Sequence, residues 1–330
     1  MDAEWTKVSK IECLGEVDDY VYDLSIEDND PFFFASDILV HNTDSCYFTA
    51  YPTFKTDIDS GSVQWSKEVA ITVYDAIADN TNDSFPQFME RAFHAPPKNG
   101  SIIKAGRELI GDRALFIKKK KYAINIYDKE GKRKDVDGRR GSIKAMGLDT
   151  KRSDTPKYVQ VFLQQVLEEV LAGANREDVI KMIVDFKTTM SEKPAWEKGS
   201  PRAANKLTWY QEQEDRATNG KFNMPGHVRA ALNWNNLRRM HGDNYSMRIV
   251  DGMKVIVCKL RPNALNYTSI AYPTDELRLP AWFKELPFDD SAMETTLVDQ
   301  KLDNLIGILK WDFKQDINIK SSFNNLFSFE

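Results

Sequence analysis

The junction between residues 42 and 43 constrains this chain more than any other stretch, because two kinds of chemistry meet there. His41 and Asn42 end an alternating, strand-like segment, and Thr43 places a hydroxyl directly after them. An asparagine amide can attack its own carbonyl and break the next peptide bond, while an imidazole supplies a proton and a hydroxyl accepts an acyl group. Asp44 then brings a carboxylate, a ligand for hard cations, into a half-apolar segment. The sequence predicts peptide-bond chemistry on one side of this junction and metal chemistry on the other.

Residues 5 to 42 resemble the C-terminal fragment of an intein, which usually ends in His-Asn and is followed by Ser, Thr or Cys. The resemblance implies a small all-β fold of the HINT type for residues 1–42. It also implies splicing roles for His41, Asn42 and Thr43. A polar turn after an apolar strand is the alternative reading of the His-Asn pair.

One departure from the intein pattern is Asp30-Pro31, which stand where many inteins carry a histidine. The departure affects the assisting proton relay and leaves the asparagine chemistry in place. Because the sequence contains no intein N-terminal block, we expect the fragment to act together with a partner chain that carries one.

The net charge of −5 averages two oppositely charged pieces. Residues 1–42 contain 11 acidic and 2 basic residues, whereas residues 43–330 carry a net charge of +4. Residues 104–157 contain 17 Lys or Arg against 8 Asp or Glu. An acidic leader on a basic body fits a removable segment with a basic partner, followed by a body that binds phosphates.

Thr43-Asp44-Ser45 resembles the second half of the Tyr-Gly-Asp-Thr-Asp-Ser palm motif of family B DNA polymerases. The resemblance implies that Asp44 is the second of two metal-binding carboxylates and that the first lies on another chain. Two Mg²⁺ ions would then activate the primer hydroxyl and neutralise the leaving pyrophosphate. Arg107-Glu108 looks like a palm Arg-Glu pair, which implies that Glu108 assists the metals. The alternatives are a strand-capping carboxylate for Asp44 and an ion pair with a neighbouring arginine for Glu108.

A run of four lysines precedes an aromatic residue over residues 118–122. It resembles the Lys-Lys-x-Tyr motif of the same polymerases, matched by Lys119, Lys120 and Tyr122. The resemblance implies that these residues hold the primer-template. A solvated strand edge guarded by lysines is the alternative.

Residues 142–157 resemble the palm-to-thumb junction of T-even-like phage polymerases, where Lys-x-Met-Gly leads to Ser-x-Thr-Pro-Lys. Glycine permits close backbone approach, and Thr-Pro is a favoured helix start beside which phosphate can bind. The residues that this resemblance assigns to DNA are Lys144, Gly147, Lys151, Arg152, Thr155 and Lys157. An ordinary capped helix with solvated cations is the alternative.

Residues 225–231 resemble the Pro-x-His-x-Arg-Gly thumb segment of the family, which implies DNA contacts for His227 and Arg229. A hydrogen-bonded structural histidine is the alternative for His227. The tail over residues 321–330 resembles the sliding-clamp peptide of phage polymerases, with Phe323, Leu326 and Phe327 as clamp contacts. A tail that folds back onto the core is the alternative.

Hydrophobic periodicity and turn residues predict the elements. The expected elements before residue 132 are a strand over 43–51, helices over 63–78 and 85–93, strands over 101–104 and 114–127, and a turn over 128–131. Those after it are a helix from 157 that Gly173 stops, a helix over 176–187, an irregular polar stretch, and a hairpin of 248–250 and 254–260 around Asp251-Gly252.

We therefore expect an α+β chain in three parts. Residues 1–42 are the intein fragment, residues 43–141 the end of a polymerase palm with an antiparallel sheet and helices, and residues 142–330 a largely helical thumb. The sequence contains no apolar run of membrane-spanning length and no signal peptide, and its three cysteines lack metal-binding spacing. We expect the chain in the cytoplasm of a phage host.

The resemblances imply the C-terminal half of a split replicative DNA polymerase, joined by trans-splicing to an N-terminal half. Its other partners would be primer-template DNA, deoxynucleoside triphosphates (dNTPs) and a sliding clamp. One alternative is a DNA-binding subunit that associates with its partner without splicing. Another is a protein that only cleaves itself after Asn42.

Overall fold

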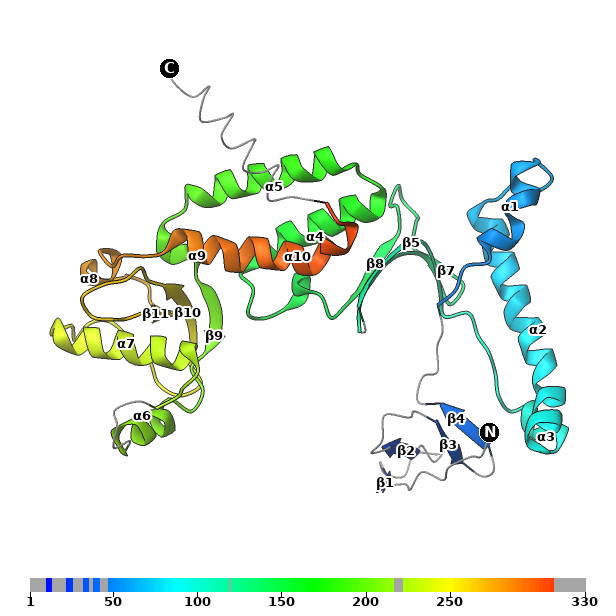
Figure 1. Ribbon diagram of the computed structural model, residues 1–330, viewed down its shortest axis with the longest axis horizontal. Coiled ribbons are helices and arrows are strands. Elements are labelled where there is room, and N and C mark those ends of the chain that lie inside the picture. The colour runs from blue at the N-terminus through cyan, green and yellow to red at the C-terminus, as the bar shows by residue number, and fades with distance from the viewer. Residues whose placement is uncertain are drawn as a thin grey trace, which may run out of the picture. The chain divides into compact units, whose positions relative to one another are not determined.

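The computed structural model describes residues 10–13, 22–25, 32–35, 38–41, 47–118, 120–216 and 222–311 (Figure 1). The chain forms two compact units, one from residues 1–110 with 128–132 and the other from residues 111–127 with 133–330. Helices and antiparallel sheets are both present, which confirms the α+β class. None of the described helices is both long and apolar enough to cross a membrane.

The first unit begins with two strand pairs. β1 (Lys10–Cys13) pairs antiparallel with β2 (Tyr22–Ser25), and β3 (Phe32–Ala35) pairs antiparallel with β4 (Ile38–His41). A strand, β4, is therefore present in the strand-like segment that ends at His41 and Asn42.

Helix α1 (Tyr51–Asp59) follows, and it corrects the strand predicted over residues 43–51. Within the described part of that range, residues 47–50 have no regular structure and Tyr51 already starts the helix. Pro52 lies in the first turn, where its missing N–H costs no hydrogen bond and its fixed φ suits a helix.

Helix α2 (Lys67–Phe93) replaces the two helices predicted over residues 63–78 and 85–93. The Ser66 hydroxyl accepts the N–H of Val69 as N-cap, and His94 ends the helix in the left-handed conformation. Pro86 lies inside the helix without ending it. The prediction divided one helix into two at residues 79–84, which are all polar and interrupt the apolar pattern.

The strand predicted over residues 101–104 is wrong, because a turn follows the short helix α3 (Pro97–Gly100) instead. Next along the chain, the Asn82 side chain binds Ala105 through both of its amide atoms. The Ala105 N–H donates to Asn82 Oδ1 at 2.6 Å, and Asn82 Nδ2 donates to the Ala105 carbonyl at 3.0 Å. A side-chain amide thus supplies the two bonds that a partner strand would have made.

A four-stranded antiparallel sheet contains β5 (Leu109–Lys118), β6 (Lys121–Lys129), β7 (Lys132–Arg133) and β8 (Ser142–Met146). β6 pairs with β5, β7 and β8. The single strand predicted over residues 114–127 is therefore two strands, and the lysine run lies at the turn between them. Lys120 has a φ of 63°, a left-handed conformation that a strand cannot contain.

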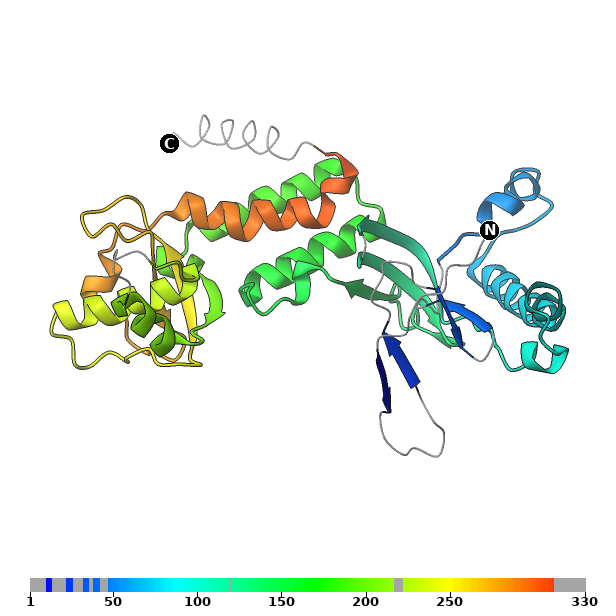
Figure 2. The ribbon, with the colours of Figure 1, turned by 60° about the horizontal axis from the view of Figure 1, so that its bottom comes forward.

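The first hydrophobic core of the second unit lies between this sheet and three helices. These are α4 (Lys157–Ala172), α5 (Arg176–Ser191) and α10 (Gln300–Ile306). Figures 1 and 2 both show α10 alongside α4. The helix predicted to stop at Gly173 is confirmed, and the helix predicted over 176–187 is present and continues to Ser191.

The second core contains the stretch after residue 190 that was predicted to be irregular. It holds η2 (Ala195–Lys198), β9 (Ser200–Ala203), α6 (Leu207–Arg216), α7 (Gly226–Met240), β10 (Lys254–Lys259), β11 (Ser269–Pro273) and α8 (Ala281–Lys284). The sheet order is β11-β10-β9, and Trp234 and Phe283 are fully buried in this core. Then α9 (Asp290–Glu294) and η3 (Thr295–Asp299) lead into α10, and η4 (Gly307–Leu309) follows it.

The hairpin predicted around Asp251-Gly252 is also corrected. The turn is present, but residues 248–250 form no strand, and β10 pairs instead with β9 and β11. The Asp251 carboxylate accepts the N–H of Leu207 at the start of α6. A turn signal located the reversal correctly, but it could not identify the pairing partner.

Candidate nucleic-acid interface

Two of the predicted DNA-binding motifs lie against each other. Gly147 has a φ of 65°, and a Cβ at this position would lie 2.3 Å from the carbonyl oxygen of Lys120. One residue earlier, Met146 pairs with Tyr122 across β8 and β6. The close backbone approach expected of Gly147 is present, and the approaching backbone is that of the lysine turn itself. Lys120 is exposed there, whereas Lys119 lies outside the described residues.

Strand alternation places Tyr122 and Lys144 on the same face of the sheet. Lys144 pairs with Ile124, and Met146 pairs with Tyr122, so these side chains share one face. Ala123 and Ala145 point to the opposite face, where they pack in the first core with α4. Tyr122 and Lys144 therefore face away from that helix, and the Tyr122 ring lies 5.8 Å from the Phe116 ring.

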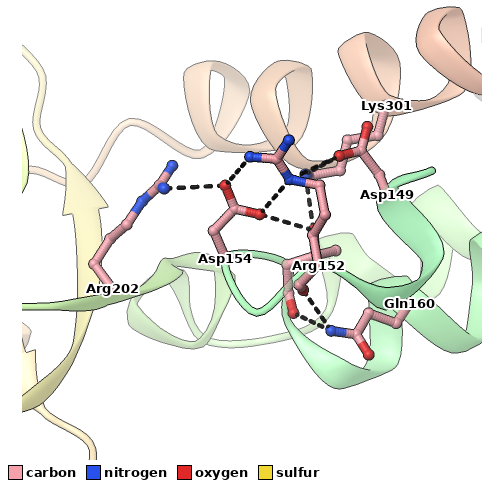
Figure 3. Close-up of polar contacts among 7 residues, drawn as sticks. Asp149, Arg152, Asp154, Gln160, Arg202 and Lys301 are labelled. Carbon is pink, nitrogen blue, oxygen red and sulfur yellow. Dashed lines mark hydrogen bonds and ion pairs between the residues drawn. The ribbon is translucent and has the colours of Figure 1, made fainter. Parts of the chain in front are cut away.

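A network of charged and polar residues surrounds the turn before α4. We call it the Asp154 cluster, and it consists of Asp149, Arg152, Asp154, Thr155, Gln160, Arg202 and Lys301. Figure 3 labels all of these except Thr155. Arg152 donates two hydrogen bonds to the Asp154 carboxylate, at 3.0 and 2.9 Å, and lies 3.3 Å from Asp149. The hydrogen bond from Arg152 and the nearby positive charges lower the pKa of Asp154 to about 2.

The structure therefore places the six residues of the 142–157 motif in different settings. Lys151 and Lys157 are exposed, and Lys157 is the first residue of α4. Arg152 is paired with two carboxylates within the chain. Thr155 is only 2% exposed and does not cap the helix, because Pro156 is the N-cap residue. Instead, the Thr155 hydroxyl accepts a hydrogen bond from Lys301 at 2.8 Å.

His227 and Arg229 both lie in the first turn of α7. Arg229 donates to the Glu214 carboxylate and to the Phe222 carbonyl, the latter at 3.2 Å. Burial and the positive charge of Arg202 lower the pKa of His227, so its neutral form is favoured at pH 7. The structure thus gives Arg229 internal partners and favours the neutral imidazole of His227.

The residues predicted to bind Mg²⁺ are not brought together by the described part of the chain. Asn42, Thr43 and Asp44 lie outside it, and His41 is described only as the backbone end of β4. Glu108 is exposed, and its carbonyl accepts the N–H of Glu130. Within the described ranges, no group of three or more His, Cys, Asp or Glu could hold a metal. Metal binding by Asp44 and Glu108 stays a prediction.

Arg107, the neighbour of Glu108, forms an ion-pair triad within the first unit. Its guanidinium donates to Asp75 and to Asp128, and the Asp128 side chain is only 2% exposed. This position makes Arg107 an anchor between α2 and the end of β6. The predicted clamp contacts Phe323, Leu326 and Phe327 lie outside the described residues.

Sequence reasoning missed the distant members of the Asp154 cluster. Arg202 reaches Asp154 from β9 and Lys301 reaches Thr155 from α10, and no motif in the sequence connects them. The nearby pair Arg152 and Asp154 did carry a signal, because opposite charges two residues apart in a turn can pair. The spacing of these two charges indicates that Arg152 binds Asp154 within the chain.

No family model matches the sequence, but several relatives match about half of it. The DNA-directed DNA polymerase of Enterobacteria phage T4 is 31% identical over 157 residues, which are 47% of this chain and 16% of that protein. The DNA-directed DNA polymerase of Escherichia phage RB69 is 29% identical over 197 residues, which are 58% of this chain and 19% of that protein. The DNA polymerase of Thermococcus hydrothermalis is 26% identical over 175 residues, which are 53% of this chain and 8% of that protein. The chain therefore contains a region similar to DNA polymerases, and it spans less than a fifth of the length of these relatives.

Proposed function

We propose that residues 43–330 are the C-terminal part of a replicative DNA-directed DNA polymerase, with the end of the palm over 43–141 and the thumb over 142–330. The observation that carries this proposal is the similarity of about half the chain to the polymerases of two phages. Primer-template DNA and dNTPs are then the substrates, and the host cytoplasm is the place of action.

The geometry supports a surface that holds DNA. The exposed Lys120 sits in the turn that Gly147 contacts, and Tyr122 and Lys144 share the sheet face that is turned away from the first core. Lysines neutralise backbone phosphates, and an aromatic ring can pack against a sugar or base. The two polymerase-like motifs would thus act as one surface.

We further propose that Asp44 is one of the Mg²⁺ ligands and that the other metal-binding aspartate is supplied by a partner half. Glu108, an exposed carboxylate before β5, would assist it. When bound, Mg²⁺ supplies charge neutralisation for phosphoryl transfer and activation of the primer hydroxyl.

Residues 1–42 are proposed to be a split-intein fragment that joins the two halves. The Asn42 side-chain nitrogen attacks its own backbone carbonyl, and the bond to the Thr43 nitrogen breaks as His41 donates a proton to the leaving amine. The upstream segment, held as an ester on Thr43 Oγ1, then transfers to the freed amine and forms an ordinary peptide bond. The paired strands β3 and β4, the latter ending at His41, support this reading.

Mass spectrometry after mixing the chain with its partner half tests the splicing. The expected product has lost residues 1–42 and gained the mass of the upstream segment, and Asn42→Ala should block its formation. Stable association without a mass change would support the DNA-binding subunit that does not splice. Loss of residues 1–42 on incubation alone would support self-cleavage.

Primer extension by the ligated product tests the polymerase. Asp44→Ala should abolish nucleotide incorporation and leave primer-template binding nearly unchanged, because it removes a metal ligand and no phosphate contact. Incorporation at the normal rate by this variant would contradict the metal role. Removal of residues 321–330 should lower processivity with the sliding clamp present and leave distributive synthesis intact.

A further inference from the structure

The Asp154 cluster connects the turn over residues 149–155 to two segments remote in sequence. From β9, Arg202 donates to the Asp154 carboxylate at 3.0 Å. From α10, Lys301 donates to the Thr155 hydroxyl at 2.8 Å and lies 3.6 Å from Asp149 (Figure 3). Both connections lie within the second unit. The turn is therefore fixed from outside by two cations that belong to other elements.

Gln160 fixes the same turn from within α4. Its side-chain amide donates to the carbonyl of Arg152 at 2.7 Å and to that of Thr155 at 3.0 Å. The Thr155 N–H donates to the Arg152 carbonyl at 3.1 Å, which closes the turn. Because hydrogen bonds that share partners polarise one another, we expect this network to hold the turn in one conformation.

One exposed lysine lies within this turn and another follows just after it. Lys151 closes the short helix η1 (Asp149–Lys151), and Lys157 begins α4. The N-terminus of α4 carries a partial positive charge that favours phosphate. The position of the turn therefore decides how both lysines and the helix end are presented to a DNA backbone.

We propose that Lys301 and Arg202 are positioning residues for DNA binding. They hold the turn over residues 149–155, through Thr155 and Asp154, so that Lys151 and Lys157 meet consecutive phosphates. This inference rests on the proposed function, because it concerns how that same surface grips DNA.

The burial of Lys301 argues for an indirect role. Its side chain is 12% exposed and that of Asp149 is 10% exposed. To reach a phosphate, Lys301 would have to leave both Thr155 and Asp149, and the buried Asp149 carboxylate would keep only Arg152 of its two cations. Arg202 is different, because its side chain is 44% exposed while it binds Asp154. An experiment must therefore separate positioning from direct contact for each cation.

Hydrogen exchange tests the holding of the turn without any DNA. Lys301→Met keeps the length of the side chain and removes its charge and donors, so exchange at residues 150–157 should accelerate. Exchange in β10, which lies in the other core, should not change. Lys301→Arg retains a cation with several donors and should restore most of the protection. Unchanged exchange at residues 150–157 in Lys301→Met would overturn the proposal.

Binding of a labelled primer-template at several salt concentrations tests the consequence. Lys301→Met and Arg202→Gln should each weaken binding about fivefold or more at every salt concentration. The reason is that each removes a contact that is coupled to DNA binding but is not itself a phosphate contact. Neither should change the slope of log affinity against log salt. Lys151→Gln is the comparison variant, and it should lower that slope by about 0.9 because it removes a phosphate contact.

Each other outcome has a defined meaning. A slope lowered by about 0.9 in Arg202→Gln or Lys301→Met would make that residue a phosphate contact and overturn its positioning role. A lower melting temperature with unchanged affinity would mean a purely structural role, which also overturns it. If the unaltered chain binds no DNA, the proposed function fails at this surface, and the exchange data still decide whether these cations hold the turn.

Discussion

The apolar stripe of α4 is buried, whereas that of α2 is mostly not buried in the described residues. α4 buries six side chains in 16 residues, whereas the 27 residues of α2 bury only Ala70 and Met89 among the described residues. The apolar stripe of α4 fills a core that the same chain supplies, with Leu115, Ala123 and Leu302 on the facing elements. The limits of α4 could therefore be predicted from its stripe and its terminal glycine. The stripe of α2 meets no comparable core in the described residues.

Local contacts take the place of a core around α2. Trp65 lies 5.8 Å from the ring of Tyr51 and 5.6 Å from that of Phe54, and Ser66 caps the helix start. Such contacts are worth less than a filled core, because each contributes about 1 kcal/mol. Under the proposed function, the half-exposed side chains of α1 and α2 would pack against the rest of the palm.

The largest expected effect tests this contrast between the two helices. Leu163→Ala, at a fully buried position of α4, should lower the free energy of opening of that helix by about 2–5 kcal/mol. Ile77→Ala, at a partly buried position of α2, is the matched change and should cost about 1 kcal/mol or less. Native-state hydrogen exchange measures both. Equal costs would show that α2 has a core of its own.

A smaller effect is expected where the lysine turn meets β8. Gly147→Ala places a Cβ 2.3 Å from the Lys120 carbonyl oxygen and should cost about 1–3 kcal/mol through backbone strain and the clash. Gly252→Ala is the control, because Gly252 has a φ of 80° and no atom lies within 4 Å of the added Cβ. Denaturant unfolding measures the difference. If the two variants lose equal stability, Gly147 is needed only for its backbone angle.

The smallest expected effect concerns pH and the Asp154 cluster. The pKa of Asp154 is lowered from 3.8 to about 2 in the folded chain, so the folded state favours the charged carboxylate. Its contribution to stability is present above pH 4 and is lost as the pH falls toward 2, by at most about 2 kcal/mol. Asp154→Asn should flatten the stability curve in this window. The same pH dependence in both proteins would exclude Asp154 as its source.

The sequence predicted features that depend on residues near one another in the chain. It did not predict contacts between residues far apart in the chain. Gly147 was expected to permit a close backbone approach, and the structure shows the approach. Asn175 and Gly173 mark helix ends in the way that their conformational preferences dictate. The lysine run was assigned to a strand, and its turn contains no glycine or proline that would have indicated the reversal. The contacts of Thr155 with Lys301 and of Asp154 with Arg202 depend on tertiary packing, which no local pattern encodes.

The central claim is that residues 118–157 present a surface that holds primer-template DNA. The variant with Lys120, Lys151 and Lys157 all changed to glutamine removes three exposed cations from this surface. Its control changes Lys98, Lys181 and Lys254, three exposed lysines elsewhere, and has the same net charge.

The most direct measurement is the affinity of both variants for a labelled primer-template across a range of salt concentrations. The account predicts that the slope of log affinity against log salt falls by about 2.7 in the first variant and stays unchanged in the control. Equal slopes in the two variants would contradict the account, because they would show that only net charge, and no built surface, attracts the DNA.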